Sequence, residues 1–511
     1  MEQVGTDSNQ HLNNTVRTVS FGAVWSMLRY PFVFLSVAIF LPLMGEDNYG
    51  RYSFFMSVFL IWDTLTQIGN TQVFGRYVPE LSRSGKDSAR HMLHGMLFYN
   101  VMIALLVMGV ALVFFGVFKL QGFSPEWMLI LCMLLLFGKL QGTLFAFLYG
   151  LNHIGRFSSR ETMRSAFTFV FVILLYRFFG LSGALWGLVA NEVALSAASV
   201  WWTRDYLFSR SPRMTFSEFK PYLLFGIAFY APTVLLTVLQ RCGNILVSQL
   251  TCSFEEVTFF DVSNQFLLLT GSFLVILMTT LLPSLTTLHV QGDEKTVQKW
   301  QRVVMGCCGV VAFLAFNTLF WVGRPVLYWW RPTASEAIWF NALAIAPALI
   351  PMLVCQAGLN LAILDKKPAT YAWAVFTGLA TMVAVSIFLI SGCGMQSRGA
   401  SWGTVAGYGV MAAVFLMKYR ERLWDSLGSF MRAIIAGLGC LALAAVPLMC
   451  VSNILRNDHD LMLGLLNNRL SIAITALVVT SLVYIIVLFL IKVISVADVR
   501  KVLSACRSRT Q

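Results

Sequence analysis

The sequence predicts an all-α polytopic membrane protein with about fourteen transmembrane helices. Two observations predict this class. Hydrophobic residues make up 58% of the chain and charged residues 12%, whereas a soluble domain carries about 25% charged residues. The apolar residues also occur in long uncharged blocks, and a block of about 20 residues crosses the hydrocarbon core as a helix. The membrane is therefore the expected solvent for most of the chain.

Fourteen apolar segments have the length of a transmembrane helix. The first follows a polar stretch without the pattern of a cleavable signal peptide, so we expect it to remain as a helix. The fifth and sixth are separated only by the short stretch from Gly180 to Gly183, which leaves one broken helix as an alternative. The segments are 21–43, 53–75, 95–118, 127–150, 165–181, 184–202, 222–248, 262–288, 303–323, 339–364, 370–391, 399–417, 431–451 and 470–491.

The basic residues predict the orientation. With the N-terminus in the cytoplasm, most of the 37 Lys and Arg residues fall in cytoplasmic loops, as the positive-inside rule requires. Arg76, Arg83, Lys86 and Arg90 share one such loop, and Lys119 is alone in the next outer loop. An even number of segments places both termini in the cytoplasm. The net charge of +13 then follows from topology and requires no nucleic-acid partner.

Short motifs recur in the same order in two halves of the chain, with a slowly growing offset. This order indicates duplication of a six-helix unit. Because six is even, both copies have the same orientation, as in transporters built from parallel repeats. The matches are Phe21-Gly22 with Phe225-Gly226, Pro79 with Pro283, Gly150-Leu151-Asn152 with Gly358-Leu359-Asn360, and Gly183-Ala184-x-Trp186-Gly187 with Gly399-Ala400-x-Trp402-Gly403.

The duplication predicts three parts. We expect a six-helix N-terminal lobe at residues 1–213 and a six-helix C-terminal lobe at residues 214–429. Two extra transmembrane helices and a cytoplasmic tail follow at residues 430–511. The small residues of the last repeated motif lie at helical spacing and predict close helix packing within each lobe, so we assign them no role in substrate binding.

Five ionisable residues fall inside the predicted segments, where a charge near the bilayer centre costs about 2.5–3.5 kcal/mol. Such groups tend to face a partner or a water-filled cavity. They are Arg29, Asp63, Lys139, Glu192 and Arg241. One interpretation is a cationic cavity between the lobes, lined by the three basic residues and suited to a phosphate group. The other is internal pairing, Arg29 with Asp63 and Lys139 with Glu192.

The positions of two basic residues favour the cavity. Arg29 and Arg241 lie on the first and seventh segments, which are the corresponding leading helices of the two repeats. The acids have a different interpretation. Asp63 and Glu192 are the only embedded carboxylates, so they are the candidates for coupling to an H⁺ or Na⁺ gradient.

Motifs of soluble enzyme chemistry are missing from the sequence. It contains no phosphate-binding loop, nucleophile elbow or dinucleotide fingerprint. The ten cysteines are scattered, and most lie in apolar segments, where cysteine behaves as a small hydrophobic residue. We therefore expect no enzyme activity, no metal and no cofactor other than the ion gradient.

The chain resembles a known group of transporters. The features that support the resemblance are the fourteen-segment plan, Tyr77-Val78-Pro79-Glu80-Leu81-Ser82-Arg83 with its counterpart Leu282-Pro283-Ser284-Leu285, the Gly-Leu-Asn motif and the two Gly-Ala-x-Trp-Gly segments. They resemble the polysaccharide-transport branch of the multidrug, oligosaccharidyl-lipid and polysaccharide exporter superfamily, which includes the O-antigen flippases. The resemblance implies two six-helix lobes around a cationic cavity that opens alternately to either side. The last two helices resemble the extra pair of the lipid II flippases.

This resemblance also implies a substrate and a location. The substrate would be a polyprenyl-diphosphate-linked oligosaccharide, a precursor of O-antigen, lipopolysaccharide or exopolysaccharide. Its diphosphate and sugar would enter the cavity while the polyprenyl tail stays among membrane lipids. The location would be the bacterial inner membrane, with polysaccharide polymerase or synthase proteins as partners.

Two alternatives remain at this point. One is a cation-coupled multidrug antiporter of the same superfamily, which usually has twelve helices and binds cations with buried acids. The two extra helices and the basic excess among the embedded residues favour the flippase. The other alternative is a non-transporting scaffold in a polysaccharide synthase complex.

Overall fold

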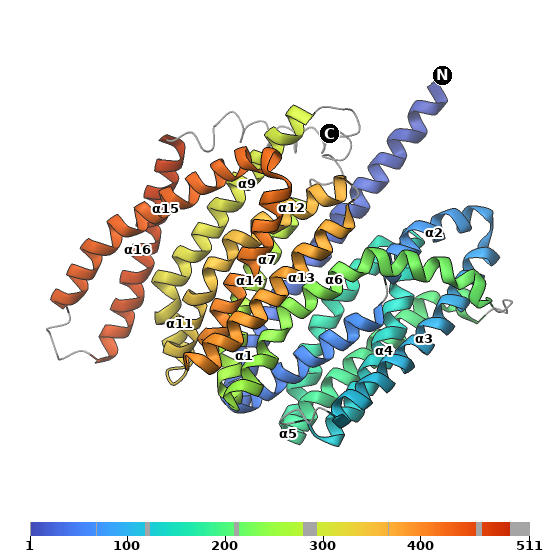
Figure 1. Cartoon of the computed structure of the whole chain (residues 1–511), viewed down its shortest axis with the longest axis horizontal. Helices are drawn as coiled ribbons and strands as arrows, with labels where there is room; N and C mark the ends of the chain where they lie inside the picture. The colour runs from blue at the N-terminus through green and yellow to red at the C-terminus, as the bar shows by residue number, and fades with distance from the viewer. Residues whose placement is uncertain are drawn as a thin grey trace. The chain divides into compact units, whose positions relative to one another are not determined.

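The computed structural model describes residues 2–67, 69–117, 123–208, 214–279, 294–365, 367–455 and 462–490. In these ranges every regular element is a helix (Figure 1), which confirms the predicted all-α class. The helices are α1 (Glu2–Gln67), α2 (Asn70–Ser84), α3 (Lys86–Val117), α4 (Pro125–Gly150), α5 (Ile154–Leu207), α6 (Phe216–Thr251), α7 (Phe254–Thr279), α9 (Glu294–Thr318), α10 (Arg324–Trp330), α11 (Ser335–Ile345), α12 (Leu349–Leu364), α13 (Pro368–Ile387), α14 (Ser397–Lys418), α15 (Arg420–Leu455) and α16 (Met462–Leu490).

Each predicted segment coincides with helix over its described residues, except that a turn at Gly69 interrupts segment 53–75. Two helices hold more than one segment, because α1 is kinked at Gly45 (φ 75°) and α5 at Gly180 (φ 60°). Eight described stretches are long and apolar enough to cross a membrane, or nine if the bent α6 counts as one. Two of the eight, Leu28–Ser82 and Ile154–Leu207, each contain two predicted segments. The chain is therefore a polytopic helical membrane protein, and fourteen is an approximate count.

The chain forms two compact units, Met1–Thr258 and Phe259–Gln511. The first contains α1 to α6 and the start of α7. Helix α6 belongs to it because it packs against α1 and α2, although the repeat assigns this helix to the second lobe. The lobe boundaries at residues 213 and 429 remain a prediction from the duplication.

Two helices of the first unit begin with sequences that cap a helix N-terminus. The Ser124 hydroxyl accepts a hydrogen bond from the Trp127 amide, and Pro125 occupies the first helical position of α4. Thr215 and Glu218 form a reciprocal capping box at the start of α6. Such caps satisfy amides that have no partner within the helix, so they define where α4 and α6 start.

The repeated Gly-Ala-x-Trp-Gly motif allows close packing of two helical arms in both units. In α5 the two arms fold back on each other, and a β-carbon on Gly183 would lie 2.0 Å from the Leu175 carbonyl oxygen. In the second unit a β-carbon on Gly403 of α14 would lie 2.0 Å from the Ser386 hydroxyl oxygen of α13. Each hairpin is thus closed at a glycine, as the packing interpretation predicts.

Other repeat matches have different outcomes. Gly150-Leu151-Asn152 ends α4, with Asn152 in the left-handed region (φ 63°). Its counterpart, Gly358-Leu359-Asn360, lies inside α12, which continues to Leu364 because apolar residues follow it. The segment Leu282-Pro283-Ser284-Leu285 lies outside the described residues.

Turns of the first unit meet near both ends of its helices. At one end the Phe55 ring packs against Trp127 (5.6 Å between centroids) and Phe54 packs against Phe254 (5.8 Å). At the other end the Tyr99 hydroxyl donates to the Met214 carbonyl (3.2 Å). Loops assigned to the same side of the membrane thus contact one another, and the side that faces the cytoplasm remains a prediction.

Helices α1 and α6 are both interrupted, and the two interruptions are in contact. Between α1 and α2, Gly69 adopts a left-handed conformation (φ 65°). Helix α6 bends by 49° between Ile227 and Tyr230. A β-carbon on Gly69 would lie 2.6 Å from the Gly226 carbonyl oxygen, so glycine at 69 allows this close backbone approach.

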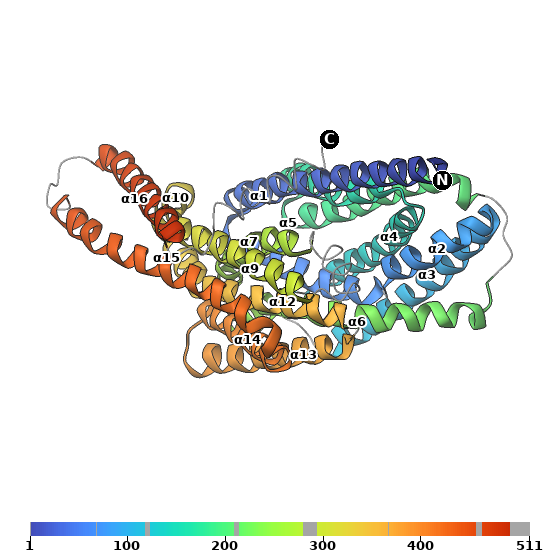
Figure 2. The same ribbon diagram turned by 90° about the horizontal axis from the view of Figure 1, so that it is seen from above.

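The extra C-terminal helices are part of the second unit. Helices α15 and α16 lie next to each other in both views (Figures 1 and 2). The buried Asn317 of α9 donates to the Thr480 hydroxyl of α16 at 2.9 Å, and the Tyr484 hydroxyl donates to the Ala433 carbonyl of α15 at 3.0 Å. These side-chain hydrogen bonds join the pair to each other and to α9.

Candidate functional site

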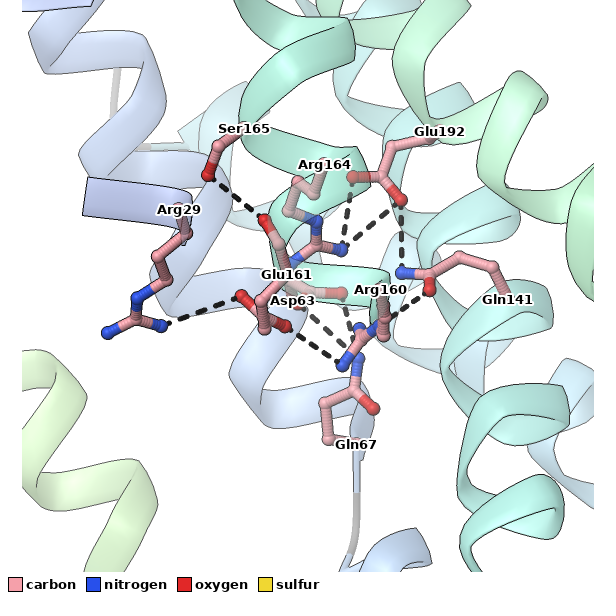
Figure 3. A network of polar contacts seen from close by, with 9 residues as sticks. All are labelled: Arg29, Asp63, Gln67, Gln141, Arg160, Glu161, Arg164, Ser165 and Glu192. Atoms are coloured by element: carbon pink, nitrogen blue, oxygen red, sulfur yellow. Dashed lines mark hydrogen bonds and ion pairs between the residues drawn. The ribbon is translucent and has the colours of Figure 1, made fainter. Parts of the chain in front are cut away.

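A network of charged and amide side chains lies among α1, α4 and α5 of the first unit (Figure 3). It contains three of the five embedded residues predicted from the sequence, and Lys139 contacts the same end of α1. Three basic and three acidic side chains form the network, and Lys139 beside it makes the formal count four basic groups to three acidic groups. The charged groups are Arg29, Lys139, Arg160 and Arg164, and Asp63, Glu161 and Glu192.

Three charged members of this network and the Gln141 amide were not predicted from the sequence. Arg160, Glu161 and Arg164 were assigned to a cytoplasmic loop because their charges interrupt the apolar segment. The structure begins α5 at Ile154, directly after the tight turn at Asn152. One signal could have revealed them: Arg160 and Arg164 are four residues apart, which places them on one face of a helix.

The buried end of the network is centred on Glu192. This residue is 2% exposed, and its carboxylate lies 3.1 Å from the Arg164 guanidinium. The Gln141 amide donates to Glu192 at 3.1 Å, and its oxygen accepts from Arg160 at 2.7 Å. A buried carboxylate needs such a set of partners to offset its lost hydration. Glu192 therefore pairs with Arg164, and the pairing with Lys139 considered from the sequence is not formed.

Lys139 bonds the backbone of α1 rather than a carboxylate. Its side chain is fully buried, and its ammonium group donates to the Thr66 carbonyl in the last turn of α1. Carbonyls in a last helical turn have no partner within the helix, and a cation there complements the helix dipole. Lys139 thus caps α1 where the helix breaks. The expectation that Lys139 binds substrate remains a prediction.

Further polar groups support the same break. Asn70, the first residue of α2, accepts a hydrogen bond from Asn100 at 3.0 Å. Asn100 also donates to the Thr143 hydroxyl at 3.2 Å. All three side chains are buried. Helices α3 and α4 therefore supply partners for the residue at which the chain resumes its helix.

The two acids predicted to couple an ion flank one glycine of α4. A β-carbon on Gly138 would lie 3.1 Å from the Asp63 carboxylate and 3.8 Å from that of Glu192. The side-chain amide of Gln67 donates to Asp63 at 3.2 Å, and it packs on Gly142, one turn further along α4. The two glycines leave space for the polar groups of α1, and this brings Asp63 close to Glu192.

The other end of the network is open. Arg29 and Glu161 face each other across 3.9 Å, with side chains 33% and 39% exposed. Glu161 also lies 3.4 Å from Arg160. Arg29 therefore pairs with Glu161 of α5, and its pairing with Asp63, considered from the sequence, is not formed. Figure 3 shows the Arg29 side chain approaching this carboxylate from α1.

Arg241 is not part of this network. It lies half-buried on α6, one turn before Asn244. The Asn244 amide donates to the Ser57 hydroxyl of α1 at 2.8 Å. The structure thus places both predicted arginines, Arg29 and Arg241, in the first unit on helices that pack together.

Comparisons with known proteins identify the family. Residues 16–289 match the family described as polysaccharide biosynthesis protein, which is more than half of the 511-residue chain. No curated protein matches the sequence.

Solved structures share the fold. The inward closed conformation of lipid II flippase MurJ is 13% identical, with a TM-score of 0.64 over 91% of this chain and 98% of that one. An inward-facing multidrug resistance MATE transporter of the MOP superfamily is 13% identical, with a TM-score of 0.63 over 79% of this chain and 99% of that one. A MOP superfamily transporter from Pyrococcus furiosus, described as having a binding pocket of reverse polarity, is 13% identical with a TM-score of 0.58 over 80% and 96%.

At this identity the likeness establishes the fold alone, while the match of residues 16–289 establishes the family. Both agree with the resemblance drawn from the sequence motifs. The chain therefore belongs to the polysaccharide biosynthesis protein family, and it has the membrane fold that MurJ and the MATE transporters share.

Proposed function

We propose that the protein is a flippase that translocates a polyprenyl-diphosphate-linked oligosaccharide across the bacterial inner membrane by alternating access. The observation that carries this proposal is the formal excess of one basic group in the network taken together with Lys139, with Arg29 at its partly exposed end. Membership of a polysaccharide biosynthesis family supports a glycan precursor as cargo. The fold shared with a lipid II flippase supports movement of a lipid-linked molecule.

The chemistry of the substrate fits this charge. A diphosphate needs cations in a region where water is scarce, and arginine binds phosphate oxygens through two parallel N–H donors. At an effective dielectric constant near 20, unit charges about 4 Å apart interact by roughly 4 kcal/mol before desolvation is counted. We assign the diphosphate to Arg29 and Arg241. Lys139 would join them only in a conformation that releases the Thr66 carbonyl.

The energy source and the partners follow from the same proposal. Asp63 and Glu192 lie close together beside Gly138, so they are the carboxylates that would bind H⁺ or Na⁺ during transport. The translocated oligosaccharide would pass to a polymerase or synthase on the outer face of the membrane.

A multidrug antiporter is the second candidate function. It is favoured by the MATE fold and by the same pair of buried acids. A drug antiporter must attract a cation, whereas the network and Lys139 together have more basic than acidic groups. This charge balance places the antiporter second, ahead of a scaffold that transports nothing.

Deletion of the protein, followed by complementation with variants, tests the proposal. We expect the deletion to abolish a surface or secreted polysaccharide without changing resistance to cationic dyes. Arg29→Ala and Arg241→Ala should lower polysaccharide export at least about tenfold, equivalent to about 1.4 kcal/mol, while the protein in the membrane falls less than twofold. Dye sensitivity with normal polysaccharide would overturn the flippase in favour of the antiporter. Purified protein that moves no lipid-linked glycan in liposomes would indicate a scaffold.

A further inference from the structure

We infer that Glu161 is a resident counter-anion that competes with the substrate's diphosphate for Arg29, and that it thereby sets anion specificity and promotes release. This inference rests on the proposed flippase function, because it assigns Arg29 to the diphosphate. Neither the charge pattern nor the hydropathy of the sequence pointed to Glu161.

The two ends of the network differ in how firmly their ion pairs are held. Arg164 and Glu192 approach to 3.1 Å, with side chains 22% and 3% exposed, and Glu192 has a further donor in Gln141. Arg29 and Glu161 are separated by 3.9 Å and are the most exposed charged groups of the network with an ion pair. Charge-assisted hydrogen bonds between arginine and carboxylate are about 2.7–2.9 Å long. The Arg29–Glu161 separation is far beyond this range, whereas Arg164 and Glu192 are close to it and more buried, so the open pair is the one that can exchange.

Glu161 keeps a cationic partner when its ion pair with Arg29 is broken. Its other carboxylate oxygen lies 3.4 Å from Arg160, and Arg160 is fixed in turn by its hydrogen bond to Gln141. Removing one partner of a buried pair is costly mainly because it leaves the other charge uncompensated. Since Arg160 continues to neutralise Glu161, that cost is avoided when an anion takes Arg29.

A diphosphate is an anion that can displace the Glu161 carboxylate from Arg29. It offers more charge and more acceptor oxygens than a carboxylate, in a geometry that the guanidinium fork matches. A singly charged or neutral headgroup gains too little from Arg29 to displace Glu161. After translocation the tethered carboxylate is still beside Arg29, so it can reclaim the guanidinium and favour departure of the substrate.

Removal of the carboxylate should therefore have opposite effects on binding and turnover. Glu161→Gln leaves Arg29 without its competitor, so the purified full chain should bind farnesyl diphosphate about three- to tenfold more tightly in titration calorimetry. Binding of farnesol should not change. In the complementation assay the same variant should export polysaccharide more slowly, because release now lacks its competitor. A role in stability alone would lower binding and export together.

The matched control is Glu126→Gln. This carboxylate lies in the same unit but is held by Ser182 and Trp186 rather than by an arginine, so its loss should leave the affinity for farnesyl diphosphate unchanged. Glu161→Asp keeps the charge but shortens the side chain, and it should bind the probe more tightly than the wild type and less tightly than Glu161→Gln. It decides the question if Glu161→Gln does not fold.

The outcomes separate this inference from the function on which it rests. If Glu161→Gln and Glu161→Asp bind farnesyl diphosphate no more tightly than the wild type, while Arg29→Ala weakens binding, the competition is refuted and the flippase stands. If Arg29→Ala changes neither binding nor export, the assignment of the diphosphate to Arg29 fails, and the competition fails with it.

Discussion

At the scale of single residues, the first unit depends on how each embedded charge is neutralised. Arg164 and Glu192 form an ion pair in which the carboxylate is almost fully buried. By contrast, Arg204 lies 3.7 Å from Asp205, and these two side chains are 53% and 88% exposed. A pair in water contributes little to stability, whereas a buried carboxylate that loses its partner is strongly destabilising. Loss of the buried ion pair should therefore lower the free energy of unfolding more than loss of the exposed ion pair.

We therefore expect Arg164→Ala to lower the free energy of unfolding by about 3–5 kcal/mol and Arg204→Ala by less than about 1 kcal/mol. Thermal unfolding of the purified protein, followed by size-exclusion chromatography, would measure the difference. Adding Glu192→Gln to Arg164→Ala removes the stranded charge and keeps a side chain that can bond Gln141, so it should recover much of the loss. A double variant no more stable than Arg164→Ala would contradict this explanation.

The sequence was informative about which residues are embedded but not about their partners. Asp63, Lys139 and Glu192 were identified because a charge stands out in an apolar segment. Their partners could not be identified in this way. Arg164, for example, lies in a helical turn that was left out of the predicted segment because the residue is charged. Lys139 bonds a backbone carbonyl, and no residue pattern marks a carbonyl as an acceptor.

At the scale of elements, the hairpin of α5 depends on the absence of a side chain at Gly183. A β-carbon there would lie 2.0 Å from a backbone oxygen of the opposite arm, and backbone cannot move aside as a side chain can. Helix α3 provides the contrast, since a β-carbon on Gly109 would meet nothing within 4 Å. The repeated motif is thus required for packing, whereas an isolated glycine on an exposed face is not.

We expect Gly183→Ala to lower the free energy of unfolding by at least about 1–3 kcal/mol, the usual cost of overpacking. Gly109→Ala should leave stability unchanged or raise it by up to about 1 kcal/mol, because alanine loses less backbone entropy in a helix. Expression in the membrane and thermal stability would compare the two variants. Equal stability of both would show that the arms of the hairpin can separate without penalty.

At the scale of the whole molecule, composition and hydropathy were sufficient for the fold class. Long apolar blocks predict helices because a backbone in lipid must satisfy its own hydrogen bonds. The repeat motifs predicted the equivalence of the two hairpins. The early start of α5 could not be predicted from hydropathy, since it depends on polar groups that become tolerable only once they are paired in the folded protein.

The predicted topology can be tested on the intact protein. We expect positions 89 and 295 to face the cytoplasm and positions 48 and 255 to face outward, because this orientation places most basic residues inside. Single cysteines introduced by Ala89→Cys, Lys295→Cys, Asn48→Cys and Glu255→Cys in a cysteine-free background would be treated in whole cells with an impermeant thiol reagent. Labelling of position 89 or 295 would overturn the orientation.

The lysine that caps α1 implies an order of events during synthesis. Lys139 is 73 residues further along the chain than the carbonyl it satisfies, and a ribosome adding about 5–20 residues per second needs roughly 4–15 s to reach it. Until then the nascent segment around Gly69 lies in the bilayer without its ammonium donor, so a continuous helix is the less costly form. The break should therefore appear only after α4 has been inserted. A cysteine placed by Gln67→Cys can report this change through its rate of labelling by a thiol reagent. The rate should differ between stalled chains that end before residue 139 and chains that include α4.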